Sequence, residues 1–425
     1  MTIKIFTQKR LKMRSFKFLS ISILSFILLF PGYLLAEKAL ISNINTVAPE
    51  SSFNAIRNPA LMSFGKGSSI GVAYMYNSLT ESKTEADVVL SGTKFNSKVE
   101  SDQEYDVTFF LSTVYKSDKS SFGFGIARGD DGQMKKSSTD ITLYEPISGL
   151  TFRTHEKKEN FGTIFNLSYS YRLSPHYSIG LQGESLMASS SVNKESHVDM
   201  LNEHKEVEMK RDSVTSGLSV GYFYSGDLID FGFMIKSGRY GFEEASYKYR
   251  DTIASNDKDI SSYSLNDEGP SGAAGISIKP AENFSVSFSI GASMPYSHKV
   301  KECDDDTSSL YEYENTLKVN YGLASAGALF WNINRRVLLG AGVSFLIFNQ
   351  DIESGEIAMS GKEKFSLLRF STAITLKASR DAEIFAGVNW NNMNGTMESH
   401  KNNFEMAIDL SQKSYDFFAG LGVRY

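Results

Sequence analysis

A period-two alternation of apolar and small or polar residues recurs along most of this chain, and it limits the fold more than any other feature. In residues 284–291, Phe, Val, Phe and Ile alternate with Ser, Ser, Ser and Gly, and residues 105–115 and 161–172 alternate in the same way. Successive side chains of a β-strand point to opposite faces, so this period is typical of strands with one apolar face. A content of 12% aromatic residues and 33 glycines agrees with β structure and excludes a disordered chain.

The spacing of these segments separates two architectures that share the period, a soluble β-sandwich and a membrane barrel. Fourteen segments are expected as strands, and the gaps between them alternate between long and short without exception. The six short gaps are rich in Ser, Asp, Asn, Pro and Gly, as tight hairpins require, whereas the seven long gaps carry most of the charge. The expected strands lie at 68–79, 104–115, 121–128, 160–172, 176–188, 214–224, 228–237, 272–279, 283–293, 315–331, 335–349, 364–378, 382–392 and 413–425.

An even number of strands, with short turns at one end and long polar loops at the other, is typical of outer-membrane barrels. Closing the sheet leaves no unpaired edge, and lipid replaces the second sheet that a sandwich would need. We therefore predict an all-β fold, an antiparallel transmembrane β-barrel of about 14 strands over residues 67–425, surrounded by outer-membrane lipid.

The first 36 residues have the pattern of a secretory signal peptide. Six Lys and Arg residues and no acidic residue precede the apolar run 19–30, which a Pro-Gly pair ends. Cleavage is predicted after Ala36, and export would deliver the chain to the cell outer membrane. A single membrane anchor helix is the alternative, and it is disfavoured because the apolar run is too short to span a bilayer. Translation from Met13 instead of Met1 would leave a complete signal.

Charge and cysteine content exclude several classes of protein. Removing residues 1–36 with their six positive charges takes the formal net charge from −5 to −11, and so acidic a chain repels nucleic acid. The single cysteine, Cys303, excludes an internal disulfide. The six histidines lack metal-ligand spacing, so we predict no catalytic residues, metal or cofactor. The acidic runs 130–131 and 302–306 are interpreted as solvated loop tips, with cation binding as the alternative.

The last strand ends in an aromatic residue. Residues 415–425 alternate through Tyr, Phe, Ala, Leu and Val to the terminal Tyr425. A final strand of this kind resembles the signal read by the outer-membrane insertion machinery, which is therefore a predicted partner.

Residues 37–66 precede the first strand and contain no strand-period run, so we predict a short plug segment there. One or two helical turns are expected from residue 51, and a proline stops them. The run 55–62 (AIRNPALM), followed directly by an alternating strand, resembles the FadL family of outer-membrane transporters. The motif residues are Arg57, Asn58, Pro59, Ala60 and Leu61.

This resemblance implies a fold and a function. Members of the family take up long-chain fatty acids or aromatic hydrocarbons through fourteen-stranded barrels, and an N-terminal hatch with an Asn-Pro-Ala motif plugs the lumen. An inward kink of the third strand beside the motif opens a lateral hole in the wall. Residues 37–66 are fewer than in a typical hatch, which is a departure from the family pattern.

The motif residues have matching physical properties. Pro59 fixes its own φ and biases Asn58 towards an extended backbone, and the Asn58 amide is then free to hydrogen-bond backbone groups that a kink leaves unpaired. The alternative is a local turn that only starts the first strand. In the short third strand, Gly123 and Gly125 are candidates for the kink, or else simply small inward residues.

Apolar residues on the inward register suit a hydrophobic ligand better than ions. The candidate contacts are Phe110, Val114, Ile164, Phe223, Met234 and Phe330. Packing against the plug is an equal alternative for them. For a ligand carboxylate, Lys318, Arg369 and Lys236 are candidates by register and charge, although salt bridges inside the lumen, with Glu184 for example, are favoured.

The predicted function is passive uptake of a hydrophobic compound, a fatty acid or a similar lipid or hydrocarbon, which leaves sideways into the bilayer as the plug shifts. A scaffold or surface-binding protein on the same barrel is the first alternative, and a general porin is the second.

Overall fold

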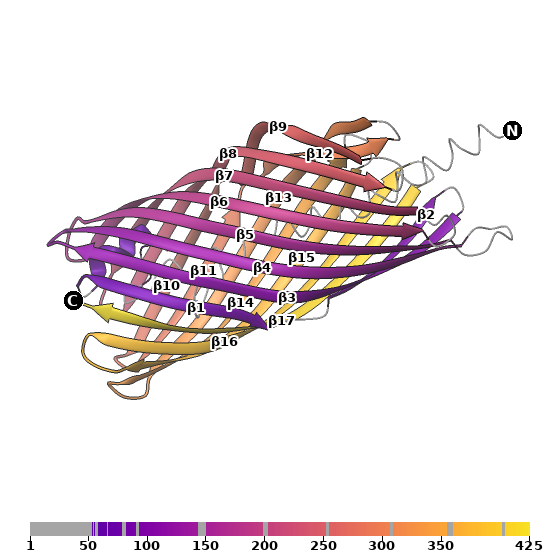
Figure 1. Cartoon of the computed structure of the whole chain (residues 1–425). Coiled ribbons are helices and arrows are strands. Elements are labelled where there is room, and N and C mark those ends of the chain that lie inside the picture. The colour runs from indigo at the N-terminus through magenta and orange to yellow at the C-terminus, as the bar shows by residue number, and fades with distance from the viewer. Residues whose placement is uncertain are drawn as a thin grey trace, which may run out of the picture.

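The computed structural model describes residue 53, residue 55 and residues 58–65, 67–78, 82–90, 93–142, 150–198, 203–251, 255–306, 309–354, 360–401 and 404–425. The predicted signal peptide, most of the plug segment and Arg57 lie outside the described residues. Nearly all of the described chain is β-strand (Figure 1). Among these residues, no helix is long and apolar enough to cross a bilayer.

The elements follow one another in simple antiparallel order. A short 3₁₀ helix, η2, spans Pro59–Phe64. The strands are β1 (Ser69–Ser78), β2 (Ser82–Leu90), β3 (Thr93–Lys116), β4 (Ser120–Thr142), β5 (Leu150–Arg172), β6 (Tyr177–Val198), β7 (Glu203–Ser225), β8 (Ile229–Asp251), β9 (Ser255–Glu268), β10 (Ser271–Ala281), β11 (Phe284–Ser293), β12 (Tyr296–Asp306), β13 (Ser309–Asn332), β14 (Val337–Ser354), β15 (Ser360–Lys377), β16 (Ala382–Lys401) and β17 (Phe404–Arg424).

The seventeen strands make fourteen barrel staves. In three places two consecutive strands lie end to end along the same neighbours, so each pair counts once: β1 with β2, β9 with β10, and β11 with β12. The ladder between β1 and β17, from Ser69↔Arg424 to Ser78↔Tyr415, closes the ring. The predicted all-β fold of about 14 antiparallel strands is confirmed.

The strands are longer than the sequence predicts. Much of what was expected as long polar loop continues the ladder, as in residues 93–103 of β3 and 129–142 of β4. The sequences of these extensions are mostly polar, so they lack the regular alternation of hydrophobicity by which a strand is recognised. With these extensions the strands are long and tilted, and the barrel is tall (Figure 1).

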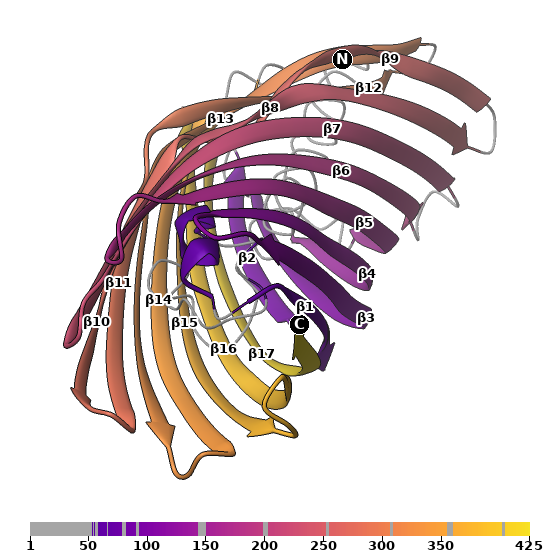
Figure 2. The same ribbon diagram turned by 90° about the vertical axis from the view of Figure 1, so that its left-hand side faces the viewer.

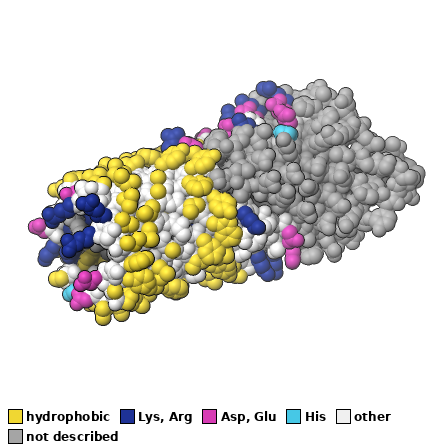
Figure 3. Space-filling view, turned by 90° about the horizontal axis from the view of Figure 1, so that it is seen from below, with side chains coloured by type: hydrophobic (Ala, Val, Ile, Leu, Met, Phe, Trp, Pro, Cys, Tyr) yellow, Lys and Arg dark blue, Asp and Glu magenta, His cyan; other side chains and the backbone are white. Residues whose placement is uncertain are grey.

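An apolar band covers the outer face of the barrel. Along β13, Tyr321 and Trp331 lie ten residues apart, with outward Leu323 and Leu329 between them, and all four side chains are exposed. A tilted strand needs about ten residues to cross a bilayer, and aromatic residues mark both interfaces of such a band. Figure 3 shows apolar side chains over the outer face of the barrel as seen from below, with charged side chains beyond their left-hand edge.

The wall is interrupted along one line that crosses four neighbouring staves. We call it the wall break: a bulge at residues 237–238 of β8, the gap 269–270 between β9 and β10, the gap 294–295 between β11 and β12, and a bulge at residue 320 of β13. Pro270 and Pro295 stand in the two gaps, where a residue without an N–H cannot extend a ladder. Above the break, no ladder joins β9 to β12 among the described residues.

The predicted kink in the third strand is wrong. Gly123 and Gly125 of β4 stay in uninterrupted ladders, opposite Val114 and Ser112 on one side and Ser168 and Asn166 on the other. Glycine keeps its backbone N–H and permits a bulge without forcing one, whereas the prolines of the wall break cannot remain in a ladder.

Gly238 allows two neighbouring interruptions of the wall break to approach each other closely. Its φ is +86°, and an added Cβ would lie 2.4 Å from the carbonyl oxygen of Glu268 and 2.9 Å from the carbonyl carbon of Gly269. Across the next gap, the backbone N–H of Met294 donates to the carbonyl oxygen of Pro270 at 2.7 Å. The interruptions on adjacent staves therefore pack against one another.

Gly238→Ala should destabilise the barrel by about 1–2 kcal/mol from the left-handed backbone alone, with the close contact adding to it. Gly272→Ala in β10 is the matched control, because its Cβ would meet only Met234 O at 3.7 Å. Urea unfolding in lipid vesicles, followed by tryptophan fluorescence, measures both. Equal free energies of unfolding for the two variants would contradict this role of Gly238.

Candidate functional site

The candidate site is the region where the plug motif meets the inner wall. Figure 2 looks along the barrel and shows η2 inside the ring of strands, near the end with the short turns. Asn58 starts this helix: its backbone is extended (φ −61°, ψ 112°) and its Oδ1 accepts a hydrogen bond from Ala60 N at 3.1 Å. Pro59 occupies the first helical position, where no N–H is needed.

The Asn58 side chain also binds the wall. Its Nδ2 donates to the carbonyl oxygens of Tyr222 and Phe233, each at 3.3 Å. These two residues are a registered pair of β7 and β8. The amide therefore does bond to wall backbone, as expected from the sequence, but on β7 and β8 rather than on the third strand. Asn58 is fully buried.

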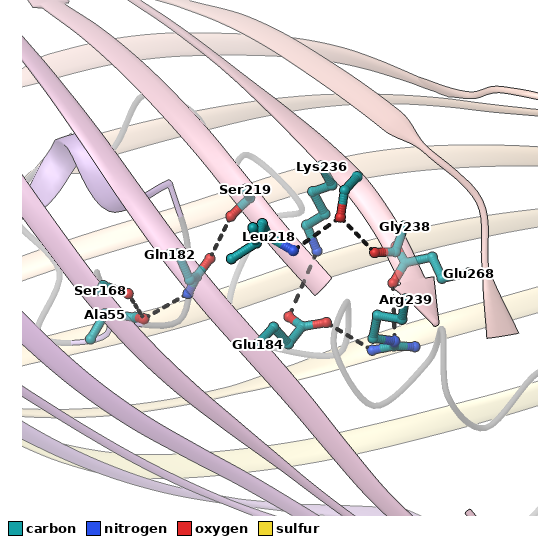
Figure 4. Close-up of polar contacts among 11 residues, drawn as sticks. Ala55, Ser168, Gln182, Glu184, Leu218, Ser219, Lys236, Gly238, Arg239 and Glu268 are labelled. Atoms are coloured by element: carbon teal, nitrogen blue, oxygen red, sulfur yellow. Dashed lines mark hydrogen bonds and ion pairs between the residues drawn. The ribbon is translucent and has the colours of Figure 1, made fainter. Parts of the chain in front are cut away.

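Two carbonyl groups of the plug accept hydrogen bonds from polar side chains of β5 and β6. The Ala55 oxygen accepts from Ser168 Oγ at 3.0 Å and from Gln182 Nε2 at 2.9 Å (Figure 4). The Ala60 oxygen accepts from Ser178 Oγ at 2.7 Å and from Ser170 Oγ at 3.3 Å. A short helix leaves its carbonyls without internal partners, and here the wall supplies them.

Three inward glycines make room for the plug. An added Cβ on Gly123 of β4 would lie 2.4 Å from Met62 Sδ, and one on Gly180 of β6 would lie 2.5 Å from Ala60 N. On Gly221 of β7 it would lie 1.9 Å from Asn58 Oδ1. Each distance is far below van der Waals contact, so a larger residue at any of the three would push the motif off the wall.

Apolar contacts complete the interface. Phe53 packs edge-on against Phe385, with ring centroids 5.8 Å apart, within a buried cluster that includes Met75 and Phe418. Leu61 lies in a second cluster with Phe223. Burial of such side chains contributes roughly 1.5–3 kcal/mol each.

Cationic side chains at the rim bind the end of the helix. Arg172 donates to the carbonyl oxygen of Ser63 at 2.5 Å and lies over the ring of Phe64, 4.5 Å from its centroid. Lys116 donates to the carbonyl oxygen of Gly65. Positive charge at the C-terminal end of a helix is favourable, because its free carbonyls carry partial negative charge.

The predicted lumen residues do face inwards, and most of them contact the plug. Phe110 and Ile164 lie in the cluster of Phe53, and Val114 lies with Ala55 and Met62. Phe223 is fully buried in the cluster of Leu61, and Phe330 packs against that cluster. Met234 shares the inward register of β8 and is half-buried. Most of the apolar lumen residues therefore pack against residues 53–64.

The prediction for Lys318 is wrong. Its side chain is 48% exposed and pairs with Glu353 at 2.5 Å, while neighbouring Leu317 and Val319 are buried. The bulge at Asn320 adds one residue to β13, so the inward register changes from odd to even numbers there. Counting back from Phe330 by twos therefore assigns Lys318 to the wrong face.

Arg369 and Lys236 do face inwards, but both have partners. Arg369 is buried, and its Nε donates to Asn391 Oδ1 at 2.6 Å. Lys236 lies 4.0 Å from Glu184, which also binds Arg239 at 2.9 Å (Figure 4). The bulge of β8 explains this, because residues 236 and 239 would face opposite sides of a regular strand. The favoured reading of Lys236, a lumen salt bridge, is confirmed.

Directly outside this ion cluster, the lipid-facing surface has a groove of about 610 Å³, which we call the outer groove. Its outward residues on β6, β7 and β8 are small (Gly183, Ser185, Ser216 and Ser237), and its sides are formed by Phe124, Leu167 and Leu218. The bulge frees the backbone N–H of Leu218 from the ladder, and Ser237 Oγ accepts it at 3.0 Å. The wall is therefore thinnest where its ladder is interrupted.

Sequence reasoning missed Gly180 and Gly221 and the hydroxyl side chains that bind the plug. Small residues alternate on many strands here, so composition alone does not mark the few that touch the plug. Only the register of β5 to β7 against η2 identifies them.

Solved structures share this architecture. A FadL homologue from Pseudomonas aeruginosa is 11% identical, with 89% of this chain and 95% of that chain aligned at a TM-score of 0.58. The chain has the FadL fold. The Pseudomonas putida toluene transporter TodX is 13% identical over 91% of this chain and 98% of its own (TM-score 0.57). The Ralstonia pickettii toluene transporter TbuX is 10% identical over 87% and 93% (TM-score 0.50).

No model of a protein family matches the sequence, and neither does any curated protein. At these identities the likeness to FadL and TodX is one of fold. It confirms the resemblance noted at the motif, and it covers the barrel as a whole. Neighbours whose names state an activity are transporters and channels, not enzymes.

Gly180→Ala should displace the motif from the wall of this FadL-like barrel, whereas Gly183→Ala should not. Both glycines lie on β6, but Gly180 faces the plug, while a Cβ on Gly183 would meet only Leu218 at 3.9 Å. Overpacking of this kind costs about 1–3 kcal/mol. Protease sensitivity of the plug in the folded barrel measures the displacement. Equal sensitivity in the two variants would show that Gly180 does not position the motif.

Proposed function

We propose that this protein lies in the outer membrane after export by residues 1–36 and admits hydrophobic compounds passively. The observation that carries the proposal is the buried plug motif in a closed fourteen-stranded barrel whose inward residues include apolar clusters. The toluene transporters that share the fold support it. The proposed ligands are fatty acids, similar lipids or hydrocarbons.

The interface between plug and wall suits a movable element. It combines eight hydrogen bonds to carbonyl oxygens with three apolar clusters, and no ion pair between plug and wall appears among the described residues. Each hydrogen bond contributes about 0.5–1.5 kcal/mol net. An apolar ligand that enters the clusters competes with Phe53 and Leu61 for the same wall residues, so its binding would favour displacement of the plug.

A lateral exit at the outer groove fits the wall. There the outward side chains on β6, β7 and β8 are small and the ladder between β7 and β8 is already interrupted at the bulge. The ion cluster of Glu184, Lys236 and Arg239 lies behind the groove, so passage requires these side chains to move aside. An apolar compound that crosses here enters the bilayer without meeting water.

Asn58→Asp tests the role of the plug. Aspartate keeps the acceptor for Ala60 N but loses both donors and turns a carboxylate towards two carbonyl oxygens, at a cost of about 1–3 kcal/mol. Uptake of labelled toluene and oleate by cells that lack other transporters should change by several-fold or more. Unchanged uptake of both compounds, with the variant folded, would argue against a plug-dependent path. Conductance of sugars by the wild type would favour a porin.

Gly183→Trp tests the exit. The indole would fill the outer groove, so uptake should fall by about tenfold while ligand binding inside the barrel persists. Gly327→Trp on β13 is the control, since nothing lies within 4 Å of its added Cβ and it faces outwards beside Phe288. If both variants transport like the wild type, the exit lies elsewhere.

A further inference from the structure

A row of polar side chains crosses the inner wall just above the plug. Asn77 of β1, Asp416 of β17 and Asn389 of β16 are direct register partners on three adjacent strands, and we call them the polar row. Their exposed fractions are 8%, 0% and 3%. Neighbouring strands lie about 4.8 Å apart, so these side chains are in mutual reach.

Each member of the polar row has an oxygen without a hydrogen-bond donor. These atoms are Asn77 Oδ1, Asp416 Oδ1 and Asn389 Oδ1. The second carboxylate oxygen of Asp416 does have donors, Asn391 Nδ2 at 3.0 Å and Asn389 Nδ2 at 3.5 Å. A buried acceptor without a donor costs about 1–3 kcal/mol, and three together are rare in a structural core.

Two of the described buried side chains beside the polar row carry opposite charges and are linked by hydrogen bonds. Arg369 Nε donates to Asn391 Oδ1 at 2.6 Å, and Asn391 Nδ2 donates to Ser414 and to Asp416. One buried cation and one buried anion are thus joined through a single amide. A second anion would meet the free oxygen of Asp416 at close range, and an ammonium group would have to give up its water next to an apolar layer.

An apolar layer lies next to the polar row on the side of the plug. Met75, Phe418 and Phe385 lie there, and Phe53 of the plug packs against them. Met75 and Phe418 are register partners, two residues along their strands from Asn77 and Asp416. The benzyl side chain of Phe53 therefore occupies the space where the apolar body of a compound held by the polar row would lie.

From this arrangement we infer that the polar row binds an uncharged hydrogen-bond donor, such as a hydroxyl group, on an apolar ligand whose body replaces Phe53. This deepens the proposed function and rests on it. It assigns the ligand class as neutral and hydroxyl-bearing, and it disfavours a carboxylate such as that of a fatty acid.

The test uses four compounds that share the benzyl group of Phe53 and differ in the group attached to it: toluene, benzyl alcohol, benzylammonium and benzoate. Binding to the full-length barrel is measured by calorimetry in detergent, in the wild type and in Phe53→Ala, which vacates the apolar layer. Benzyl alcohol should bind Phe53→Ala about tenfold more tightly than toluene, and benzoate should bind most weakly. In the wild type all four should bind more weakly.

Asp416→Asn in the Phe53→Ala background should reduce the preference for benzyl alcohol over benzoate by about tenfold, because it removes the negative charge. Asp230→Asn is the control, since Asp230 is also buried but pairs with Lys279 at 2.7 Å near the rim. If Asp416→Asn does not fold, Asn389→Ala should lower the affinity for benzyl alcohol and leave that for toluene unchanged.

The outcomes separate this inference from the proposed function. Equal binding of toluene and benzyl alcohol overturns the inference and leaves hydrophobic uptake standing. Tightest binding of benzoate or of benzylammonium also overturns it, in favour of an anion or a cation site. If none of the four compounds binds in either background, the proposed uptake through this lumen fails as well.

Discussion

Closure of the backbone hydrogen-bond network is the constraint on which this structure depends. A strand in lipid has no water to bond to, so every N–H and C=O of the wall needs a partner. The ladders between neighbouring strands, closed by the one between β1 and β17, provide that partner for most of the ring. Where the ladder is interrupted, a side chain replaces it: Ser237 accepts the free N–H of Leu218. Within the regular ladder, Asn58 also donates to the carbonyl oxygens of the registered pair Tyr222 and Phe233. The plug is thus part of the hydrogen bonding of the wall.

The same constraint explains how far the sequence could predict the fold. Alternation in the bilayer gave the number and direction of the staves, because lipid selects apolar residues on one face only. Beyond the bilayer that selection ends, so the extension of β3 through residues 93–103 left no pattern to read. Register was predictable only as far as the next bulge, and one extra residue at Asn320 reversed the expected side of Lys318.

The plug interface was predictable in part. The Asn-Pro pair marked the motif and its bond to wall backbone, because proline and asparagine have specific local geometries. The receiving surface was not predictable. Gly180 and Gly221 matter because the motif packs against them. The identity of a small residue does not indicate which residue will lie opposite it in the fold. Gly123 was singled out for a kink, yet it lies in a regular ladder and faces Met62 and Ala55.

The ladder between the first and last strands has a consequence for biogenesis. Because Ser69 pairs with Arg424 and Tyr425 N donates to Ser68 O at 3.0 Å, the ring cannot close completely before β17 has been delivered. The motif precedes β1 by only a few residues and is enclosed by the finished wall. The motif is therefore held within a few residues of its binding surface from the moment that the seam forms, so closure of the barrel also determines where the plug can bind.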